Sequence, residues 1–337
     1  MYTWFGVGIC ISKRKASAPA SGDGSYIVAG GVGMPAKILF GTAYRLSHHR
    51  LSRALRRERM VFGMRKHCLA GALAGLLILG CSGRNTLSQE SKSSPCSQAR
   101  LAFLLTRNPF ADSLLKIFAD HLLPGDYLLV GGPDSQAQWA ISKANEAQSR
   151  IKTGVRVLSW AGYVAIDELE ARVPRLPQSL DWVVYDYEGG PEFSPEFTRD
   201  QQASLGFFER GQQVSRRHGF QFMVTPPYGQ LRGANWDWGR VARFMEAITL
   251  QFQAFLQDEQ LLETEVRNVV GQIREASPQT LTFIQLSIVP ERGTVEDNLR
   301  AIRRLEDETQ ISAFLIFYRP DQSDLLRDFF RQLSRCQ

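Results

Sequence analysis

Residues 180–190 read LDWVVYDYEGG, and this stretch decides the fold and points to the site. Successive side chains of a β-strand point to opposite faces of its sheet. One face here carries Trp182, Val184, Asp186 and Glu188, and the other carries Asp181, Val183, Tyr185 and Tyr187. Val183 and Tyr185 suit packing under helices, so Asp186 and Glu188 are predicted to point into the mouth of a barrel.

Apolar runs of strand length recur along the chain and alternate with amphipathic, helix-like segments. The runs lie at 101–105 (weak and also compatible with a helix), 127–130, 155–160, 182–187, 221–224, 247–252, 281–288 and 313–318. The helix-like segments lie at 136–151, 201–217, 238–246, 263–275, 296–305 and 323–333. Strands that alternate with helices pair in parallel through right-handed crossovers.

Eight strands are the number that closes a (β/α)8 TIM barrel, and residues 96–337 have the length of one such α/β domain. A doubly wound open sheet is the alternative, since seven strands would satisfy it. No glycine-rich phosphate-binding fingerprint follows an early strand, so the sequence favours the barrel. The active face of a barrel lies at the carboxyl ends of its strands.

Asp186 and Glu188 stand two residues apart on one face, where each carboxylate increases the proton affinity of the other. One carboxyl can then stay protonated near neutral pH as a general acid while the other remains charged. Glycosidic bond cleavage uses such a pair, although hydrolysis also proceeds with assistance from the substrate. We therefore predict Glu188 and Asp186 as catalytic residues.

The run from Asp181 to Glu188 resembles the fourth-strand motif of the family-18 glycoside hydrolases, the chitinase-type barrels, which reads roughly D-G-x-D-x-D-x-E. Asp181, Asp186 and Glu188 match the motif, whereas Trp182 replaces its Gly and Val184 replaces its middle Asp. The resemblance implies that Glu188 protonates the leaving oxygen and that Asp186 orients a substrate acetamido group, which acts as the nucleophile. The absent middle Asp removes a partner that tunes Asp186.

Further candidates for sugar contacts lie on other predicted strands and on one loop. Residues 250–253 (LQFQ) resemble the family's V-Q-F-Y run, with Gln253 in place of its Tyr. Residues 315–319 (LIFYR) offer Phe317 or Tyr318 where the family often has a Trp under the sugar. The loop 225–238 is rich in rings and amides, which suit sugar recognition or simple coverage of the barrel end. The predicted substrate-binding residues are Trp160, Tyr228, Trp236, Gln251, Gln253, Gln285 and Tyr318.

Two functions stay open on these residues. The first is a glycoside hydrolase that acts on a polysaccharide or amino-sugar glycan with Glu188 as general acid. The second is a non-catalytic glycan- or ligand-binding envelope lipoprotein of the same fold, which the departures at Val184 and Gln253 favour. Glu291 would be the nucleophile of a two-glutamate glycosidase, but it lies beyond its predicted strand and is expected to be a solvated loop charge.

Residues 64–81 (MRKHCLAGALAGLLILGC) combine a positive start, an apolar core and a glycine before Cys81. This layout is typical of a secretory signal, and the core is too short to span a bilayer. Its end resembles the bacterial lipobox, which implies a signal peptide at 64–80 and lipid on Cys81. Residues 81–95 are then a polar tether. Residues 1–63 are expected to precede the true translation start, at Met60 or Met64, or to form a disordered leader.

The basic charge of the chain belongs to this upstream part. Residues 1–63 carry +8 and Arg65 with Lys66 carry +2 of the chain's net +6, so residues 82–337 carry −4. A segment with this net negative charge lacks the basic surface that nucleic-acid binding requires, so we expect no nucleic-acid partner.

The expected partners are a glycan and a membrane, reached through the lipid on Cys81. We expect an extracytoplasmic location, periplasmic or at the cell surface, and favour the outer membrane of a two-membrane cell because Ser82 follows Cys81.

Cys96 and Cys336 stand near the two ends of the predicted barrel. An oxidising compartment permits a disulfide between them, and chain ends that meet would make it easy to form. Two free thiols are the alternative. The sequence holds no Cys and His cluster of metal-binding spacing, so we expect no metal and no cofactor.

Overall fold

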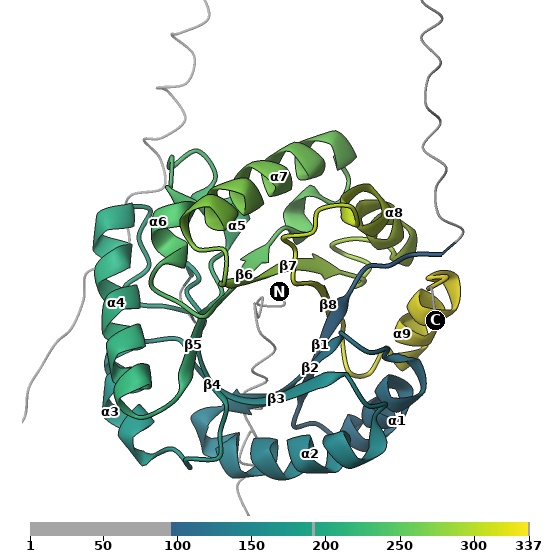
Figure 1. Ribbon diagram of the computed structural model, residues 1–337, viewed down its shortest axis with the longest axis horizontal. Helices are drawn as coiled ribbons and strands as arrows, with labels where there is room; N and C mark the ends of the chain where they lie inside the picture. The colour runs from purple at the N-terminus through teal and green to yellow at the C-terminus, as the bar shows by residue number, and fades with distance from the viewer. Residues whose placement is uncertain (1–95, 191–192, 336–337) are drawn as a thin grey trace, which may run out of the picture. The chain divides into compact units, whose positions relative to one another are not determined.

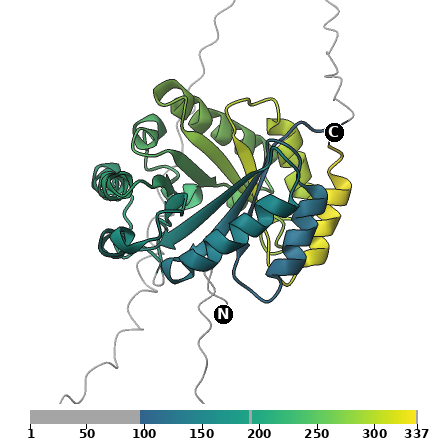
Figure 2. The same ribbon diagram turned by 60° about the horizontal axis from the view of Figure 1, so that its bottom comes forward.

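Eight parallel strands close into a barrel, and helices surround it on the outside (Figure 1, Figure 2). The arrangement comes from a computed structural model that describes residues 96–190 and 193–335. The strands follow one another around the barrel in chain order, and the first pairs with the last to close it. They are β1 (Leu101–Thr106), β2 (Tyr127–Pro133), β3 (Arg156–Tyr163), β4 (Trp182–Tyr185), β5 (Gln221–Val224), β6 (Ala247–Gln251), β7 (Leu281–Ser287) and β8 (Ala313–Phe317). The predicted (β/α)8 TIM barrel is confirmed.

All of the helices but α9, which follows β8, occupy the connections between consecutive strands, where parallel pairing requires crossovers. They are α1 (Ala111–His121), α2 (Ala137–Arg150), α3 (Ile166–Arg172), α4 (Gln201–Arg217), α5 (Tyr228–Leu231), α6 (Trp238–Ala242), α7 (Glu259–Ala276), α8 (Val295–Leu305) and α9 (Ser323–Gln332). Short 3-10 helices add η1 (Asp134–Gln136), η2 (Val173–Arg175) and η3 (Gln253–Phe255). The weak run at 101–105 is a strand. Helices α1, α3 and α5 are additional to the predicted set, and α6 ends earlier than the predicted segment 238–246.

Two apolar layers follow from the alternation of side chains along the strands. Trp182 and Val184 belong to the inner layer, which fills the barrel. Val183, Tyr185 and Tyr187 belong to the outer layer, between the strands and the helices. The predicted faces of β4 are therefore correct, and the inner face is the one that continues toward the candidate carboxylates.

The two ends of the described chain meet at the barrel face where the strands begin. Asp126, just before β2, is fully buried and accepts hydrogen bonds from the backbone N–H groups of Leu101 and Leu123, each at 2.8 Å. Arg335 pairs with the same carboxylate at 2.6 Å, and its backbone forms a parallel bridge with Ser97. The buried Asp126 carboxylate therefore holds the beginning of the described chain next to its end.

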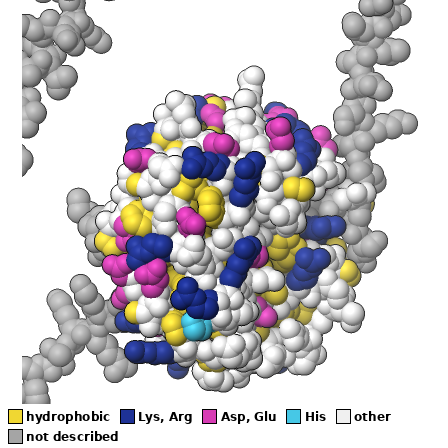
Figure 3. All heavy atoms as spheres, turned by 60° about the vertical axis from the view of Figure 1, so that its left-hand side comes forward, with side chains coloured by type: hydrophobic (Ala, Val, Ile, Leu, Met, Phe, Trp, Pro, Cys, Tyr) yellow, Lys and Arg dark blue, Asp and Glu magenta, His cyan; other side chains and the backbone are white. Residues whose placement is uncertain are grey.

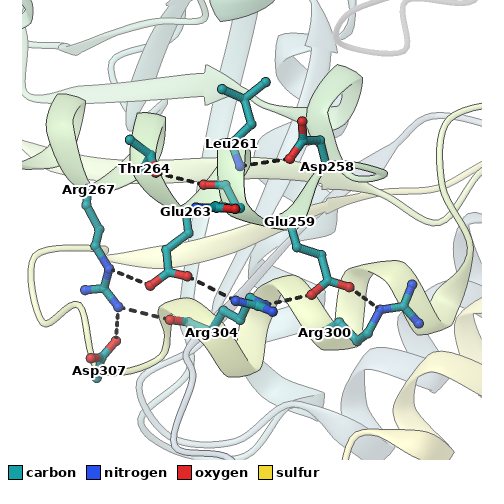
Figure 4. A network of polar contacts seen from close by, with 10 residues as sticks. Asp258, Glu259, Leu261, Glu263, Thr264, Arg267, Arg300, Arg304 and Asp307 are labelled. Atoms are coloured by element: carbon teal, nitrogen blue, oxygen red, sulfur yellow. Dashed lines mark hydrogen bonds and ion pairs between the residues drawn. The ribbon is translucent and has the colours of Figure 1, made fainter. Parts of the chain in front are cut away.

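Ion pairs link the outer helices α7 and α8 (Figure 4). Glu259 of α7 accepts from Arg300 and Arg304 of α8, each at 2.7 Å. Arg267 of α7 reaches Asp307, just after α8, at 2.8 Å. All of these side chains are exposed to solvent, which screens their charges, so the network chiefly fixes how the two helices lie together.

Basic and acidic side chains are intermixed on the face that carries α3 and α4 (Figure 3). Arg210 of α4 pairs there with Asp167 and Glu170 of α3, at 2.7 and 2.6 Å. Cations and anions on this face therefore neutralise one another locally. The expected absence of a nucleic-acid partner stays a prediction.

Several predicted features lie outside the described residues: the leader at 1–63, the signal peptide at 64–80, the lipidated Cys81, the tether at 81–95, and Cys336. Among the residues that are described, no helix has the length and apolar character needed to cross a membrane.

Candidate active site

The two predicted catalytic carboxyls stand just beyond the carboxyl end of β4. The strand ends at Tyr185, two residues earlier than predicted, so Asp186 and Glu188 lie on the segment that leaves it. Ser194 holds this segment: its hydroxyl donates to the backbone carbonyl of Asp186 at 2.9 Å, and its N–H donates to that of Glu188 at 3.0 Å. Gly189 is fixed from the other side by the Gln230 amide, at 3.0 Å. The carboxyls are therefore held by a braced loop.

Glu188 is 5% exposed, and its carboxyl accepts a hydrogen bond from the Gln251 side chain at the end of β6. The Gln253 side-chain amide donates in turn to the side-chain amide oxygen Oε1 of Gln251 at 3.4 Å. Burial, together with the neighbouring charge of Asp186, raises the pKa of Glu188 to about 8. Glu188 therefore keeps its proton at neutral pH, which a general acid requires.

Asp186 is 2% exposed and faces a different set of partners. The Thr225 hydroxyl, just past β5, donates to the Asp186 carboxylate at 2.5 Å. Below them lies a small apolar cavity whose lining includes Val184, Thr225 and Thr249. Asp186 thus has a hydroxyl donor from the segment just past β5. Val184, at the position of the middle Asp in the family-18 motif, adds only apolar surface.

Gln285 of β7 lies in the barrel interior and is fully buried, yet its side-chain amide makes no hydrogen bond within the described part of the chain. Within 96–190 and 193–335, neither its amide nitrogen nor its amide oxygen has a hydrogen-bond partner. It lies directly beside Gln251 in the pairing of β6 with β7. Buried amides are nearly always paired, so this one marks a place where a polar group of a ligand or water fits.

Trp160 of β3 lies deeper inside the barrel, at 2% exposure, with its indole N–H unpartnered within the same described ranges. Its ring crosses Gly131 of β2, where an added Cβ would come within 2.5 Å of the indole. The ring therefore packs as part of the inner layer. Its N–H, rather than its face, is the group that remains for a ligand.

Arg292, in the loop after β7, is a site residue that sequence reasoning missed. Its guanidinium lies over the ring of Phe317, 5.4 Å from the centroid, and it interacts electrostatically with Glu188. Burial lowers the pKa of Arg292 to about 10. The neighbouring Glu291 pairs with Arg319 at 3.2 Å, as expected for a loop charge. The sequence places Arg292 far along the chain from Asp186 and Glu188, and no local pattern indicates that it lies near them.

Tyr318 does not lie at the mouth. The alternation along β8 places Phe317 inward and Tyr318 outward, where its ring packs against Phe103 and Phe118. Its hydroxyl donates to the backbone carbonyl of Leu104 at 2.5 Å. The prediction of Tyr318 as a sugar contact is wrong, and Phe317 takes the corresponding position.

Tyr228 and Trp236 also belong to the outer layer rather than to the mouth. The Tyr228 ring stacks on Phe252, with centroids 4.3 Å apart, and its hydroxyl donates to Glu265. The Trp236 indole N–H donates to the backbone carbonyl of Arg199 at 2.9 Å. Each ring is 5% exposed and its polar group is satisfied, so the loop's aromatic residues cover the barrel end.

A cavity of about 980 Å³ opens beside the mouth, between the loop 229–238 and α7. Its lining is mainly polar and includes Gln230, Arg232, Asn235 and Asn268. Gln230 also bonds Gly189, so this side chain lies between the cavity and the segment that bears Glu188. The cavity is therefore separate from the carboxyl pair.

Among the described residues, no three His, Cys, Asp or Glu side chains gather in a group that could hold a metal ion. Cys96 is disulfide-bonded. Its predicted partner Cys336 lies outside the described residues, while the neighbours Ser97 and Arg335 pair with each other. The Cys96–Cys336 bond stays a prediction.

Comparison with known proteins gives a likeness of the barrel only. No protein-family model and no curated protein matches the chain in sequence. Similar solved structures include a family 18 chitinase from Crocus vernus (12% identity, 68% of this chain and 96% of that chain, TM-score 0.43). They also include the spore cortex-lytic enzyme of Bacillus cereus (10%, 69% and 74%, 0.39) and an enolase from Bradyrhizobium (14%, 66% and 53%, 0.37). The function of this chain must therefore be argued from its own residues.

Proposed function

We propose that the protein is a glycoside hydrolase that acts on a polysaccharide or amino-sugar glycan, with Glu188 as general acid. The observation that carries the proposal is the pairing of two buried carboxyls, Asp186 and Glu188, at the mouth of a barrel. Their surroundings differ, because an amide contacts Glu188 and a hydroxyl contacts Asp186. Glycosidic bond cleavage needs such a difference, with one group protonated and the other charged.

In the proposed reaction, Glu188 gives its proton to the glycosidic oxygen as the bond to the anomeric carbon breaks. Asp186 stabilises the positive charge that develops on the sugar, or orients the acetamido group of an amino sugar whose oxygen attacks the anomeric carbon. Water then supplies the hydroxyl of the product, and ionised Glu188 takes the proton that this water releases. Gln251 holds Glu188 in place for both steps.

A second candidate is glycan binding without turnover, and the amides favour it. The barrel interior offers three neutral amides that can form hydrogen bonds, those of Gln251, Gln253 and Gln285. Within the described residues, the Gln285 amide has no hydrogen-bond partner. Such groups recognise hydroxyls and amides of a ligand whether or not a bond is broken.

Turnover on a panel of chromogenic glycosides and peptidoglycan separates the two candidates. Replacing Glu188 by Gln keeps the shape of the side chain and removes the acid, so turnover should fall about 100- to 10,000-fold. Glycan binding by Glu188→Gln, measured calorimetrically, should persist. Turnover that survives the change refutes Glu188 as the acid, and binding without turnover in the unmodified protein favours the second candidate.

We further propose that the protein works outside the cytoplasm, tethered through lipid on Cys81. The described chain enters at Cys96 and Ser97, on the face where strands begin, while Asp186 and Glu188 lie where strands end. A tether attached at that entry would join the barrel on the face opposite the carboxyls and would leave the mouth unobstructed. Blocking lipoprotein signal peptidase with globomycin should make a larger precursor accumulate, and an unchanged protein size would contradict lipidation.

A further inference from the structure

The large cavity beside the barrel mouth takes no part in the proposed reaction. Its volume of about 980 Å³ is that of a site for a sizeable ligand. The apolar cavity beneath Asp186 has a volume of about 10 Å³, the room of one water molecule. Of these two cavities, the one between the loop 229–238 and α7 can therefore take several linked chemical groups.

The loop 229–238 is fastened to a polar face of α7 at two points. Glu265, at the first point, accepts from the Arg232 side chain at 3.0 Å. Gln272, about two turns further along α7, accepts from the backbone N–H of Trp238 at 3.0 Å. The cavity lies between these two attachments, so the fold itself holds it open, as is usual for ligand sites.

Neutral amides contribute to both walls of the cavity. Asn268 lies one turn from each attachment, on the same face of α7, and is exposed. Asn235 lines the cavity from the loop, in the left-handed conformation (φ 53°) that asparagine tolerates better than most residues. Trp236 and Trp238 also line it, but they are 5% and 4% exposed and leave little ring face for a sugar. Amides that both donate and accept, without an open ring face, suit peptide groups better than sugars.

The described lining of the cavity has an excess of positive charge. It holds the guanidiniums of Arg199 and Arg232 and one carboxylate, that of Glu265, which pairs with Arg232. The Arg232 guanidinium also lies over the Phe255 ring, 5.5 Å from the centroid, which fixes its orientation. Arg199 donates to the Arg232 backbone carbonyl at 2.6 Å, whereas its neighbour Asp200 caps the start of α4. A carboxylate in the cavity therefore meets guanidiniums that can bind it in a forked geometry.

One side chain connects this cavity with the segment that bears the proposed acid. Gln230 lines the cavity, and its amide bonds both the N–H and the carbonyl of Gly189, at 3.0 and 3.3 Å. Gly189 directly follows Glu188, so a single side chain separates the cavity from that segment. An extended chain advances about 3.3 Å per residue, so a few residues attached to a sugar at Glu188 reach the cavity.

We propose that the cavity binds an acidic peptide carried as a substituent by the glycan that the mouth binds. The amides of Asn235 and Asn268 pair with peptide groups, and Arg199 and Arg232 pair with the carboxylates of the peptide. This inference rests on the proposed binding of a glycan at the mouth, catalytic or not. It makes the substrate class more specific, because the preferred glycan is one that bears peptides.

Binding calorimetry on the full chain tests the inference with four ligands. They are a tetrasaccharide of N-acetylglucosamine and N-acetylmuramic acid with its lactyl carboxyls blocked as simple amides, the same tetrasaccharide with acidic peptides on those carboxyls, the peptide-bearing form with its peptide carboxyls amidated, and the free peptide. Glu188→Gln is the background for every titration, because it prevents cleavage. The acidic peptide should tighten binding of the tetrasaccharide about tenfold, equivalent to about 1.4 kcal/mol. Amidation should remove most of this gain, and the free peptide should bind more weakly than the peptide-bearing glycan.

Three substitutions locate the gain. Asn268→Trp fills the cavity from an exposed position on α7 and should abolish the gain, and Arg199→Gln should reduce it several-fold. Arg240→Gln is the matched control, because Arg240 donates to Gln202 at 2.8 Å and does not line the cavity. The affinity for the peptide-free tetrasaccharide should stay within twofold in all three. Thermal unfolding of each variant establishes that the fold is intact.

Equal affinities for the peptide-bearing and peptide-free tetrasaccharides, or a gain that survives both Asn268→Trp and Arg199→Gln, would overturn the inference while glycan binding stands. Free peptide that binds as tightly as the peptide-bearing glycan would also overturn it, since the cavity would then act without the mouth. Failure of every saccharide to bind would overturn the proposed function and this inference together.

Discussion

The barrel mouth and the aromatic loop at 225–238 look alike in sequence, but the structure uses them differently. Both combine rings with amides and were predicted to contact sugar. In the loop, the Trp236 indole and the Tyr228 hydroxyl have protein partners, and both rings are buried in the outer layer. At the mouth, Gln285 is buried without a partner in the described part of the chain. Satisfied polar groups indicate packing, whereas unsatisfied buried ones indicate a place for a ligand.

The largest expected effect is a loss of stability, and it comes from a substitution in the loop rather than at the mouth. Trp236→Ala removes a ring that packs against Tyr187, Phe208 and Trp238, so the free energy of unfolding should fall by about 3 to 5 kcal/mol. Urea denaturation measures this loss, and glycan affinity should stay within twofold. Trp236→Phe, which keeps a ring, should lose less. Affinity that falls while stability holds would make Trp236 a sugar contact after all.

The pH dependence of stability sharpens the account of Glu188. Burial raises its pKa from 4.5 to about 8, so the unfolded chain releases this proton at a lower pH than the folded chain does. Its contribution to stability is fully present below pH 4.5 and is lost as pH rises toward 8. Denaturation of the unmodified protein and of Glu188→Gln should show the variant gaining relative stability across that window. A difference that is flat between pH 5 and 8 would contradict the raised pKa.

Gln285→Met is expected to raise the free energy of unfolding, the opposite of the change expected for Trp236→Ala, and to weaken binding at the mouth. Removing a buried amide without partners should raise the free energy of unfolding by about 1 to 2 kcal/mol, because its desolvation is no longer uncompensated. The same change should weaken glycan binding several-fold. Gln212→Met is the control and should leave binding unchanged, because it replaces a buried amide of α4 whose nitrogen also has no partner within 96–190 and 193–335. Destabilisation by Gln285→Met would mean that the amide serves the fold.

The smallest expected effect concerns the hydroxyl beneath Asp186. Thr225→Val removes the donor at 2.5 Å and should lower turnover about tenfold, as expected for a hydrogen bond to a charged group. Thr225→Ser should restore most of the activity. Thr249 lines the same cavity but donates to the Met223 sulfur at 3.5 Å, so Thr249→Val should change turnover less than twofold. Equal losses in both Val variants would point to packing rather than to Asp186.

The fold was readable from the sequence because its signal is local. Alternation along 182–188 set the inward face of β4, and eight apolar runs separated by helical segments favoured a closed parallel barrel over an open sheet, as the structure confirms. Helix α3 escaped prediction because its seven residues are too few to establish a period. The end of β4 was placed too late because the alternation of side chains continues past the last ladder pair at Tyr185.

The sequence showed the site residues that lie at the ends of predicted strands, namely Asp186 and Glu188 after β4, Gln251 on β6 and Gln285 on β7. Asp186 and Glu188 are close in sequence, so their pairing needed no tertiary information. Arg292 and Thr225 reach the same carboxyls from other strands' loops, over separations that no local pattern reports. Phe317 and Tyr318 are neighbours in sequence, and the end of the alternation on β8 decided which of them faces the mouth.

The sequence by itself determined the barrel, the face on which Asp186 and Glu188 lie, and a chain whose positive charge is concentrated upstream of the barrel. These follow from periodicity and composition, which are properties of neighbouring residues. Only the tertiary structure decided which rings are packing, which amides lack partners, and which cation stands beside the acid. Those properties depend on burial and on contacts between distant segments, and both exist only once the barrel has closed.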